Sequence, residues 1–130
     1  MKSVTICSSN RFAPEVIKFA EQLKKLGVNV LSPHFYTHNY GGLEKIKDHN
    51  KKFLAMGLTH DHFHKIRKGD VVFFYNKDGY SGPSVTLELG YATALNKPTY
   101  ALSDKDVEVC RDILFEGYAK TPKELIKYLK

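Results

Sequence analysis

The stretch DVVFFYNKDGYSGPSVTLELGYATALNKPTYAL, residues 70 to 102, decides the fold class. It opens with a continuous apolar run, Val71 to Tyr75, which is typical of a strand covered on both faces of a parallel sheet. A glycine-rich turn, a helix beginning at Pro83 and a second apolar run at 99–102 follow. Because parallel strands need a crossover helix between them, this stretch predicts an α/β fold.

The rest of the chain continues the alternation of strands and helices. The remaining elements are expected at residues 4–6 (strand), 14–26 (helix), 28–31 (strand), 43–68 (one long or broken helix, interrupted near Gly57), 105–112 (helix), 113–118 (strand) and from the capping box at Thr121 onward (helix). Right-handed crossovers then predict a three-layer sandwich around a doubly wound, parallel, five-stranded sheet of the flavodoxin or Rossmann-like kind. No linker or repeat divides the chain, so residues 1–130 are expected to form a single domain.

Composition narrows the possible partners. The net charge of +6 favours anions such as phosphate esters, but the lysines are spread along helices without an aromatic-interleaved stripe, so no polynucleotide partner is expected. No apolar run approaches the ~18 residues of a membrane span, and the N-terminus lacks the apolar core of a signal peptide. Two cysteines without a CxxC pair indicate a reduced, cytoplasmic protein.

The helix that begins at Pro83 carries one carboxylate, Glu88, among small and apolar residues. At 100° per residue, Val85, Leu89 and Ala92 form the stripe that faces the sheet, and Glu88 lies about 60° from it. Glu88 is therefore expected at the edge of a buried face, near the carboxyl ends of the strands where such folds bind ligands. The alternative is a glutamate that only reaches water. The positive end of the helix dipole is expected to keep this acid ionised.

Residues around two turns could hold an anion. The N-terminus of the Glu88 helix offers free backbone N–H groups beside Ser81 and Ser84, and Arg11 and Ser9 follow the first strand. A guanidinium fork, hydroxyls and helix N–H groups are natural phosphate ligands. Tyr36, Tyr40 and Tyr80 lie in loops on the same side and could stack on a base.

Two motifs resemble the nucleoside 2-deoxyribosyltransferase superfamily, which includes the 2'-deoxynucleoside 5'-phosphate N-hydrolases. One runs from Gly82-Pro83-Ser84 through Glu88-Leu89-Gly90-Tyr91-Ala92 to Lys97-Pro98. The other, Cys7-Ser8-Ser9-Asn10-Arg11, is similar to the hydrolases' C-G-S-x-R phosphate loop with Ser8 in place of glycine. Asp70, which opens the third strand, fits the family as well, and the resemblance covers residues 3 to about 102.

The resemblance implies chemistry at an N-glycosidic bond. Glu88 would attack the anomeric carbon as the base departs, and water or a second base would resolve the covalent glycosyl-enzyme. The substrate would be a (deoxy)nucleoside or its 5'-monophosphate, with hydrolysis favoured by Arg11 and the positive charge. Substrate-binding residues carried over from the motifs and turns are Ser8, Ser9, Asn10, Arg11, Tyr80, Ser81, Gly82 and Ser84.

The sequence departs from the family at the second carboxylate, which assists the leaving base. In the family this carboxylate precedes the aspartate that opens the third strand, here Asp70. The corresponding position in this sequence is His62, with Asp61 adjacent. If Thr59, Phe63 and Ile66 face inward, His62 flanks that stripe and Asp61 points nearly opposite, so an imidazole near its normal pKa is the better general acid. Alternatively, Thr59 caps a fresh helix and Asp61 is a stabilising charge in its first turn.

Other possibilities remain open at this point. In His60-Asp61-His62-Phe63-His64 only His60 and His64 share a helix face, so no metal site is expected there. No cofactor is expected either, and Cys7 is interpreted as buried packing.

The rival functions are a deoxyribosyltransferase that moves the sugar between bases and a non-catalytic nucleotide-binding sensor. The apolar far side of the Glu88 helix, formed by Leu87, Gly90 and Ala94, predicts a homodimer or larger assembly.

Overall fold

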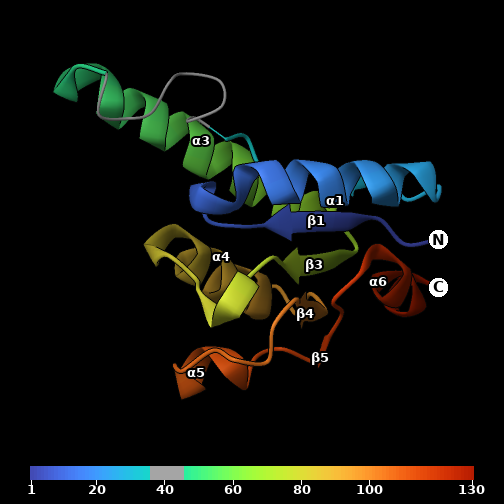
Figure 1. Cartoon of the computed structure of the whole chain (residues 1–130). Coiled ribbons are helices and arrows are strands. Elements are labelled where there is room, and N and C mark those ends of the chain that lie inside the picture. The colour runs from blue at the N-terminus through green and yellow to red at the C-terminus, as the bar shows by residue number, and fades with distance from the viewer. Residues whose placement is uncertain (36–45) are drawn as a thin grey trace.

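Five parallel strands form the sheet that positions the site. The structure is a computed structural model that describes residues 1–35 and 46–130. The strand order is β2-β1-β3-β4-β5, and all neighbours are parallel (Figure 1). The strands are β1 (Val4–Cys7), β2 (Val30–Leu31), β3 (Val71–Phe74), β4 (Thr99–Ala101) and β5 (Gly117–Tyr118). The predicted α/β class with a doubly wound parallel sheet is confirmed, and the strand order reverses between β1 and β3.

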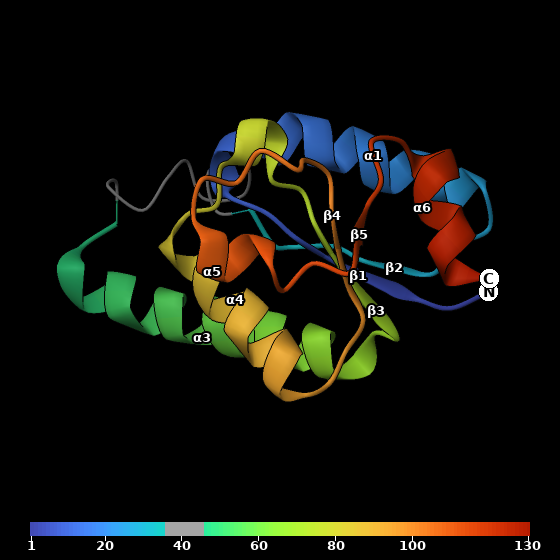
Figure 2. The same cartoon turned by 90° about the horizontal axis from the view of Figure 1, so that it is seen from below.

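Helices cover both faces of this sheet (Figure 2). The helices α1 (Ala13–Lys25) and α6 (Pro122–Leu129) lie on one face, and α3 (Asp48–Lys68) and α4 (Pro83–Ala94) lie on the other. Three short helices, η1 (Asn10–Phe12), η3 (Lys77–Gly79) and α5 (Val109–Asp112), lie in the connections. The two termini lie side by side, where the Lys2 backbone N–H donates to the Leu129 carbonyl at 2.7 Å.

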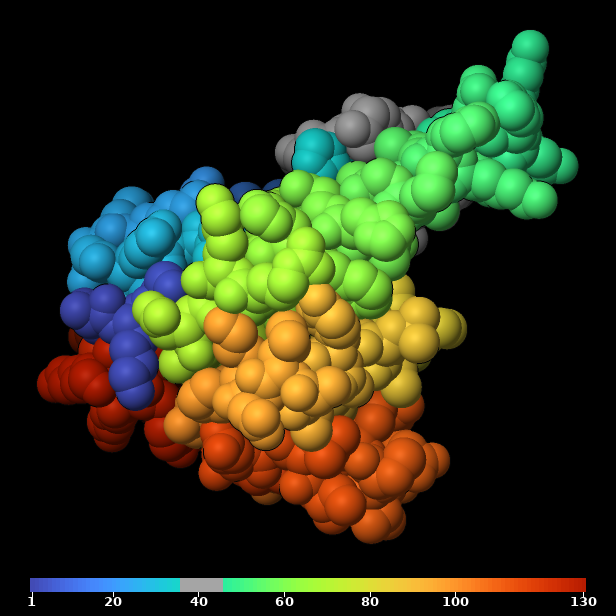
Figure 3. All heavy atoms as spheres, turned by 180° about the vertical axis from the view of Figure 1, so that it is seen from behind, coloured from blue at the N-terminus to red at the C-terminus, as the bar shows by residue number. Residues whose placement is uncertain are grey.

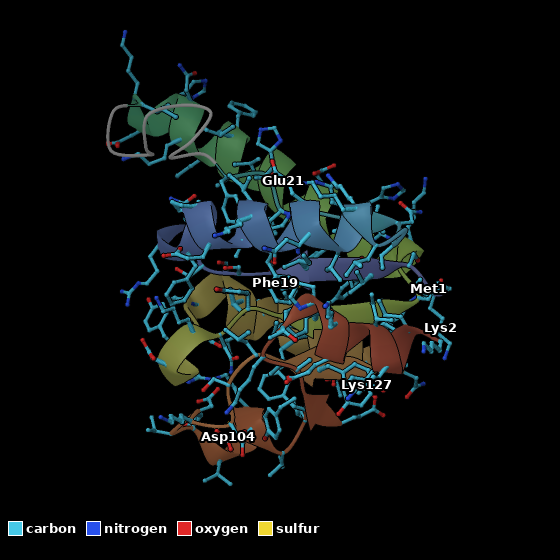
Figure 4. The ribbon with its side chains drawn as sticks, turned by 45° about the vertical axis from the view of Figure 1, so that its right-hand side comes forward. Met1, Lys2, Phe19, Glu21, Asp104 and Lys127 are labelled. Carbon is cyan, nitrogen blue, oxygen red and sulfur yellow. The ribbon has the colours of Figure 1, made fainter. Side chains whose placement is uncertain are left out.

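The alternation of side chains along β3 explains why its sequence is apolar throughout. Val71 and Phe73 pack in the core on the α1 and α6 face, while Val72 and Phe74 pack in the core on the α3 and α4 face. Phe19 of α1 stacks on Phe73 with ring centroids 5.2 Å apart. Figure 4 shows Phe19 on the sheet side of α1 and Glu21 on its outer side. A strand buried on both faces has no position for a polar side chain.

The long third helix differs from its expected form. It begins at Asp48 and runs without a break through Gly57 to Lys68, and the expected residues 43–45 lie outside the described part of the chain. An isolated glycine costs a helix only about 1 kcal/mol, so neighbouring turns can carry it. Thr59 therefore does not cap a new helix. Figure 3 shows the first half of α3 extending away from the sheet and its other helices.

The strand expected at 113–118 is only β5, Gly117–Tyr118, and two further boundary differences, at α5 and β2, follow from single hydrogen bonds. The helix expected at 105–112 is shortened to α5, Val109–Asp112. The Asp106 carboxylate accepts from the Glu108 backbone N–H at 2.9 Å, and this bond holds the residues before α5 in a turn. The strand expected at 28–31 starts at Val30, because the Val28 N–H donates instead to the Leu23 carbonyl at the end of α1. Neither difference alters the strand order.

The faces of α4 agree with helical arithmetic. Val85, Leu89 and Ala92 are buried against the sheet, as predicted. Leu87 is 64% exposed on the opposite side, together with Gly90 and Ala94. That a second copy of the chain covers this apolar side stays a prediction.

The last helix begins at a capped threonine. The Thr121 hydroxyl accepts from the Glu124 backbone N–H at 3.2 Å, and the Glu124 carboxylate accepts from the Lys120 N–H rather than from Thr121. Downstream, Leu125 and Leu129 are fully buried against α1 and the sheet. The cap therefore fixes where the amphipathic face of α6 begins.

Thr121→Ala should lower the free energy of unfolding by about 1 kcal/mol, because one N–H at the start of α6 loses its acceptor. Thr121→Ser, which keeps the hydroxyl, should stay close to wild type. Urea denaturation followed by circular dichroism measures both variants. Equal stability of the alanine and serine variants would contradict a role for the cap.

Candidate functional site

A cavity of about 200 Å³ opens at the carboxyl ends of β1 and β2, where the fold class leads us to expect ligands. Its walls come from the loop after β1, the segment after β2, the middle of α3 and the first turns of α4. The lining residues are Ser8, Asn10, Pro33, His34, Phe35, Ala55, Leu58, Thr59, His62, Ser84 and Glu88. Five of the sequence-predicted site residues are therefore in this wall: Ser8, Asn10, His62, Ser84 and Glu88.

Glu88 reaches the cavity from the second turn of α4. Its side chain is only 14% exposed, because the neighbouring Val85 and Leu89 press this side of the helix against the sheet. The predicted position at the edge of a buried face is confirmed. The alternative, a glutamate that only reaches water, does not describe this side chain.

His62 meets Glu88 from α3. The imidazole Nε2 lies 3.9 Å from Glu88 Oε1, and the histidine is only 6% exposed. The expectation that His62 merely flanks the inner face of its helix is wrong: His62 and Ile66 are buried, whereas Thr59 is exposed at the cavity wall. A stack of Phe63 on Tyr91, with centroids 4.5 Å apart, joins α3 to α4 beside this pair.

Cys7, the last residue of β1, completes the buried cluster. Its Sγ lies 3.2 Å from His62 Nε2, and the residue is fully buried. Interpretation of Cys7 as packing alone is incomplete, because its thiol also faces the Glu88 carboxyl. Two signals in the sequence indicated that this strand end lies at a site: residues 7–11 resemble a phosphate loop, and parallel sheets of this kind bind ligands at the carboxyl ends of their strands. The neighbours themselves come from helices 55 and 81 residues away in the sequence.

Burial keeps all three groups uncharged at neutral pH. Loss of hydration raises the pKa of Glu88 from 4.5 to about 8, opposed by a hydrogen bond from Cys7. Burial, followed by the charge of Lys65, lowers the pKa of His62 from 6.5 to about 4. Burial, followed by the neighbouring Glu88, raises the pKa of the Cys7 thiol well above its usual value. The 3.9 Å contact therefore joins two neutral groups at pH 7, not an ion pair.

Two sequence-based expectations need correction. The helix dipole was expected to keep Glu88 ionised, but the loss of water around its carboxyl outweighs a dipole that acts within the first turn only. His62 was expected to titrate near its normal pKa, but the same burial disfavours the imidazolium. In both cases helical spacing located the side chain, while its protonation depends on the surroundings that the folded chain supplies.

Glu88→Gln should gain stability relative to wild type as the pH rises, by roughly 2–3 kcal/mol between pH 5 and pH 7. The unfolded chain releases the Glu88 proton near pH 4.5, whereas the folded chain holds it up to about pH 8, so wild type loses stability across that window. Glutamine has no such proton to release. Denaturation midpoints of both proteins at several pH values measure the difference. A chelator keeps stray metal ions from binding the Glu88 carboxylate during the measurement.

Glu21→Gln is the matched control for that measurement, since Glu21 lies on the outer side of α1 (Figure 4). It should follow wild type at every pH. A difference between Glu88→Gln and wild type that does not change with pH would contradict a protonated Glu88.

Asp61 lies apart from this cluster. It forms an ion pair with Lys65 at 3.0 Å, its side chain is about half exposed, and it is not among the residues that line the cavity. The hydrogen bond from Lys65 lowers the pKa of Asp61. Asp61 is a charge in the middle of α3 and not in the first turn of a separate helix.

The residues of the first loop divide between the cavity and its rim. Ser8 and Asn10 line the cavity, whereas the Ser9 hydroxyl caps η1 by accepting from the Arg11 N–H at 3.3 Å. The Arg11 guanidinium lies 3.6 Å from the centre of the Tyr80 ring. Arg11 and Tyr80 therefore meet one another on the exposed surface and are outside the cavity wall.

The start of α4 provides polar groups close to Glu88. Gly82 is the N-terminal cap residue, and no side chain caps this helix. The Ser81 hydroxyl is buried and has no hydrogen-bond partner among residues 1–35 and 46–130. Ser84, in the first turn, lines the cavity. These groups suit the anion predicted from the sequence.

The remaining predictions fall elsewhere. Asp70 lies at the opposite end of the sheet, where its carboxylate accepts from the Ser3 N–H and hydroxyl at 2.8 and 2.9 Å. Tyr36 and Tyr40 lie outside the described residues. His60 and His64 are both exposed, and the described residues that bring potential metal ligands together are instead Cys7, His62 and Glu88, with donor atoms within 4.8 Å of one another.

Comparisons with known proteins add no identity to this geometry. Within the described segments, every helix is too short or too polar to cross a membrane. No protein-family model matches the chain, and no curated protein matches it.

Proposed function

We propose that this protein is an enzyme that cleaves the N-glycosidic bond of a (deoxy)nucleoside 5'-monophosphate or its nucleoside through a covalent intermediate on Glu88. The observation that carries the proposal is the buried Glu88–His62 pair, 3.9 Å apart, in the wall of a cavity at the carboxyl edge of the sheet. The resemblance of the two sequence motifs to the deoxyribosyltransferase superfamily supports the same assignment for Glu88.

One internal proton transfer would give both groups their active forms. Glu88 starts as the acid and His62 as the neutral base; moving the proton from the Glu88 carboxyl to His62 Nε2 yields a carboxylate nucleophile and an imidazolium acid. The positive charge that develops on the sugar stabilises the carboxylate, and the imidazolium gives the same proton to the leaving base.

The second half of the reaction uses the neutral imidazole that remains. His62 takes a proton from water as the water attacks the anomeric carbon, and the Glu88–sugar bond breaks with return of the carboxylate. In glycosidases the two assisting carboxyl groups lie about 6.5–9.5 Å apart where water attacks directly and about 5–5.5 Å apart where the reaction is a double displacement, and the 3.9 Å between His62 and Glu88 is nearer to the second spacing. The geometry therefore favours double displacement with retention of configuration.

The polar groups beside the pair favour a phosphorylated substrate. Ser8, Asn10 and Ser84 line the cavity, and the uncapped start of α4 offers N–H groups and the positive end of its dipole. The net charge of +6 also favours an anion. The two cysteines are both free, which suits a reducing compartment, and we propose a cytoplasmic location on that basis.

Chromatographic detection of freed base tests this proposal. The panel contains purine and pyrimidine ribo- and deoxyribonucleosides with their 5'-monophosphates, each with and without a second base as acceptor. Freed base without acceptor is expected, more from monophosphates than from nucleosides. Base exchange only with an acceptor would assign the transferase function, and binding without release from any compound would assign a nucleotide sensor.

A further inference from the structure

Three different donor atoms meet beneath the cavity, each from a different element. Cys7 Sγ comes from the end of β1, His62 Nε2 from α3 and a carboxylate oxygen of Glu88 from α4, and all lie within 4.8 Å of one another. Thiolate, imidazole and carboxylate are the ligands of protein zinc sites. The proposed reaction uses the imidazole and the carboxylate but gives the thiol no role.

The distances agree with a shared ion. Around a tetrahedral zinc, ligand bonds of about 2.0–2.3 Å place neighbouring donor atoms about 3.4–3.6 Å apart. The observed separations are 3.2 Å from Cys7 Sγ to His62 Nε2 and 3.9 Å from Nε2 to Glu88 Oε1. Small rotations of the two side chains on α3 and α4 would equalise them, and a strand and two helices are rigid supports for the donors.

The fourth position and the charge balance are also suitable. His62 and Glu88 line the cavity, so water can complete the coordination from that side, as in sites with three protein ligands. Binding of a dication releases one proton from the Cys7 thiol and one from the Glu88 carboxyl. The occupied site therefore has no net charge, which suits its burial. The thiolate excludes Mg²⁺ and Ca²⁺ as the preferred ions.

We propose that Cys7, His62 and Glu88 bind Zn²⁺ or a similar thiophilic divalent cation, with water from the cavity as the fourth ligand. The consequence for activity rests on the proposed function: an ion that holds the Glu88 carboxylate blocks its attack on the sugar, so the metal inhibits the enzyme. Substrate and ion then compete for the same groups.

Titration of the chelator-treated full chain with Co²⁺ tests the binding. One equivalent should produce the visible bands of tetrahedral Co²⁺ together with a thiolate-to-cobalt charge-transfer band, and Zn²⁺ should remove both. Cys7→Ala should abolish the charge-transfer band, and His62→Gln should weaken binding at least tenfold. Cys110→Ser is the matched control, since Cys110 is exposed, and it should bind like wild type.

Circular dichroism checks that each variant is folded. A charge-transfer band that survives Cys7→Ala, or that disappears in Cys110→Ser, would overturn the proposal. If Cys7→Ala does not fold, the pair His62→Gln and Cys110→Ser decides: equal affinity of these two variants for Co²⁺ overturns it.

Base release measured alongside separates the two proposals. Inhibition by Zn²⁺ that a chelator reverses and that added nucleotide weakens is expected. A cobalt thiolate band in a protein that releases no base would leave the metal site standing and overturn the glycosidase. Base release without any cobalt band would leave the glycosidase standing and overturn the metal site.

Discussion

Replacing Glu88 with glutamine should reduce the rate of base release on the order of 10³–10⁵-fold, or about 4–7 kcal/mol in the barrier. An amide cannot form the glycosyl ester, while it keeps the size of the carboxyl group in a side chain that is only 14% exposed. Because burial holds Glu88 protonated up to about pH 8, the neutral amide also resembles the resting state, and the variant should remain folded. Single-turnover assays with excess enzyme measure the loss.

Glu21→Gln, on the outer side of α1, is the matched control and should keep the wild-type rate (Figure 4). Mass spectrometry of wild type quenched during turnover should find the sugar attached to the peptide that contains Glu88. A Glu88→Gln variant with undiminished base release would remove the nucleophile from the mechanism, whatever the substrate.

Arg11→Ala should lower kcat/KM for a 5'-monophosphate about 10²-fold and change kcat/KM for the matching nucleoside little. Arg11 follows Asn10, which lines the cavity, so its guanidinium can reach a phosphate at the cavity rim. The guanidinium lies 3.6 Å from the centre of the Tyr80 ring, and this contact orients it. Two parallel hydrogen bonds to a phosphate would be lost with the guanidinium. Steady-state assays on both substrates measure the ratio.

Arg11→Lys should recover only part of the preference for the monophosphate, because an ammonium group keeps the charge but not the fork of donors. Loss of activity on nucleoside and monophosphate by the same factor would contradict phosphate binding and assign Arg11 to the support of the loop. Added salt should weaken the preference more in wild type than in the alanine variant.

The fold class could be predicted because its signals are local. The apolar run of β3 occurs where a strand is buried on both faces, and Pro83 and Thr121 occur where helices begin. Boundaries were less accurate where a single interaction decides them. The turn at Asp106 shortens α5, and the unbroken α3 shows that a glycine in the sequence does not by itself end a helix.

The candidate site could be predicted only in part. Helical spacing placed Glu88 at a buried edge, because the direction of a side chain around a helix follows from the sequence alone. Spacing also selected His62 over Asp61, although His62 is more deeply buried than expected. Cys7 was missed as a member of the cluster, since its neighbours come from two helices distant in the sequence.

The sequence by itself therefore determined the alternation of strands and helices, the parallel sheet and the helix face that carries Glu88, because periodicity and capping act over a few residues. Only the tertiary structure decided that Cys7, His62 and Glu88 touch, and that the acid is protonated and the imidazole neutral at pH 7. The physical reason is that a pKa depends on the water that neighbouring elements exclude, and the packing of β1, α3 and α4 determines that exclusion.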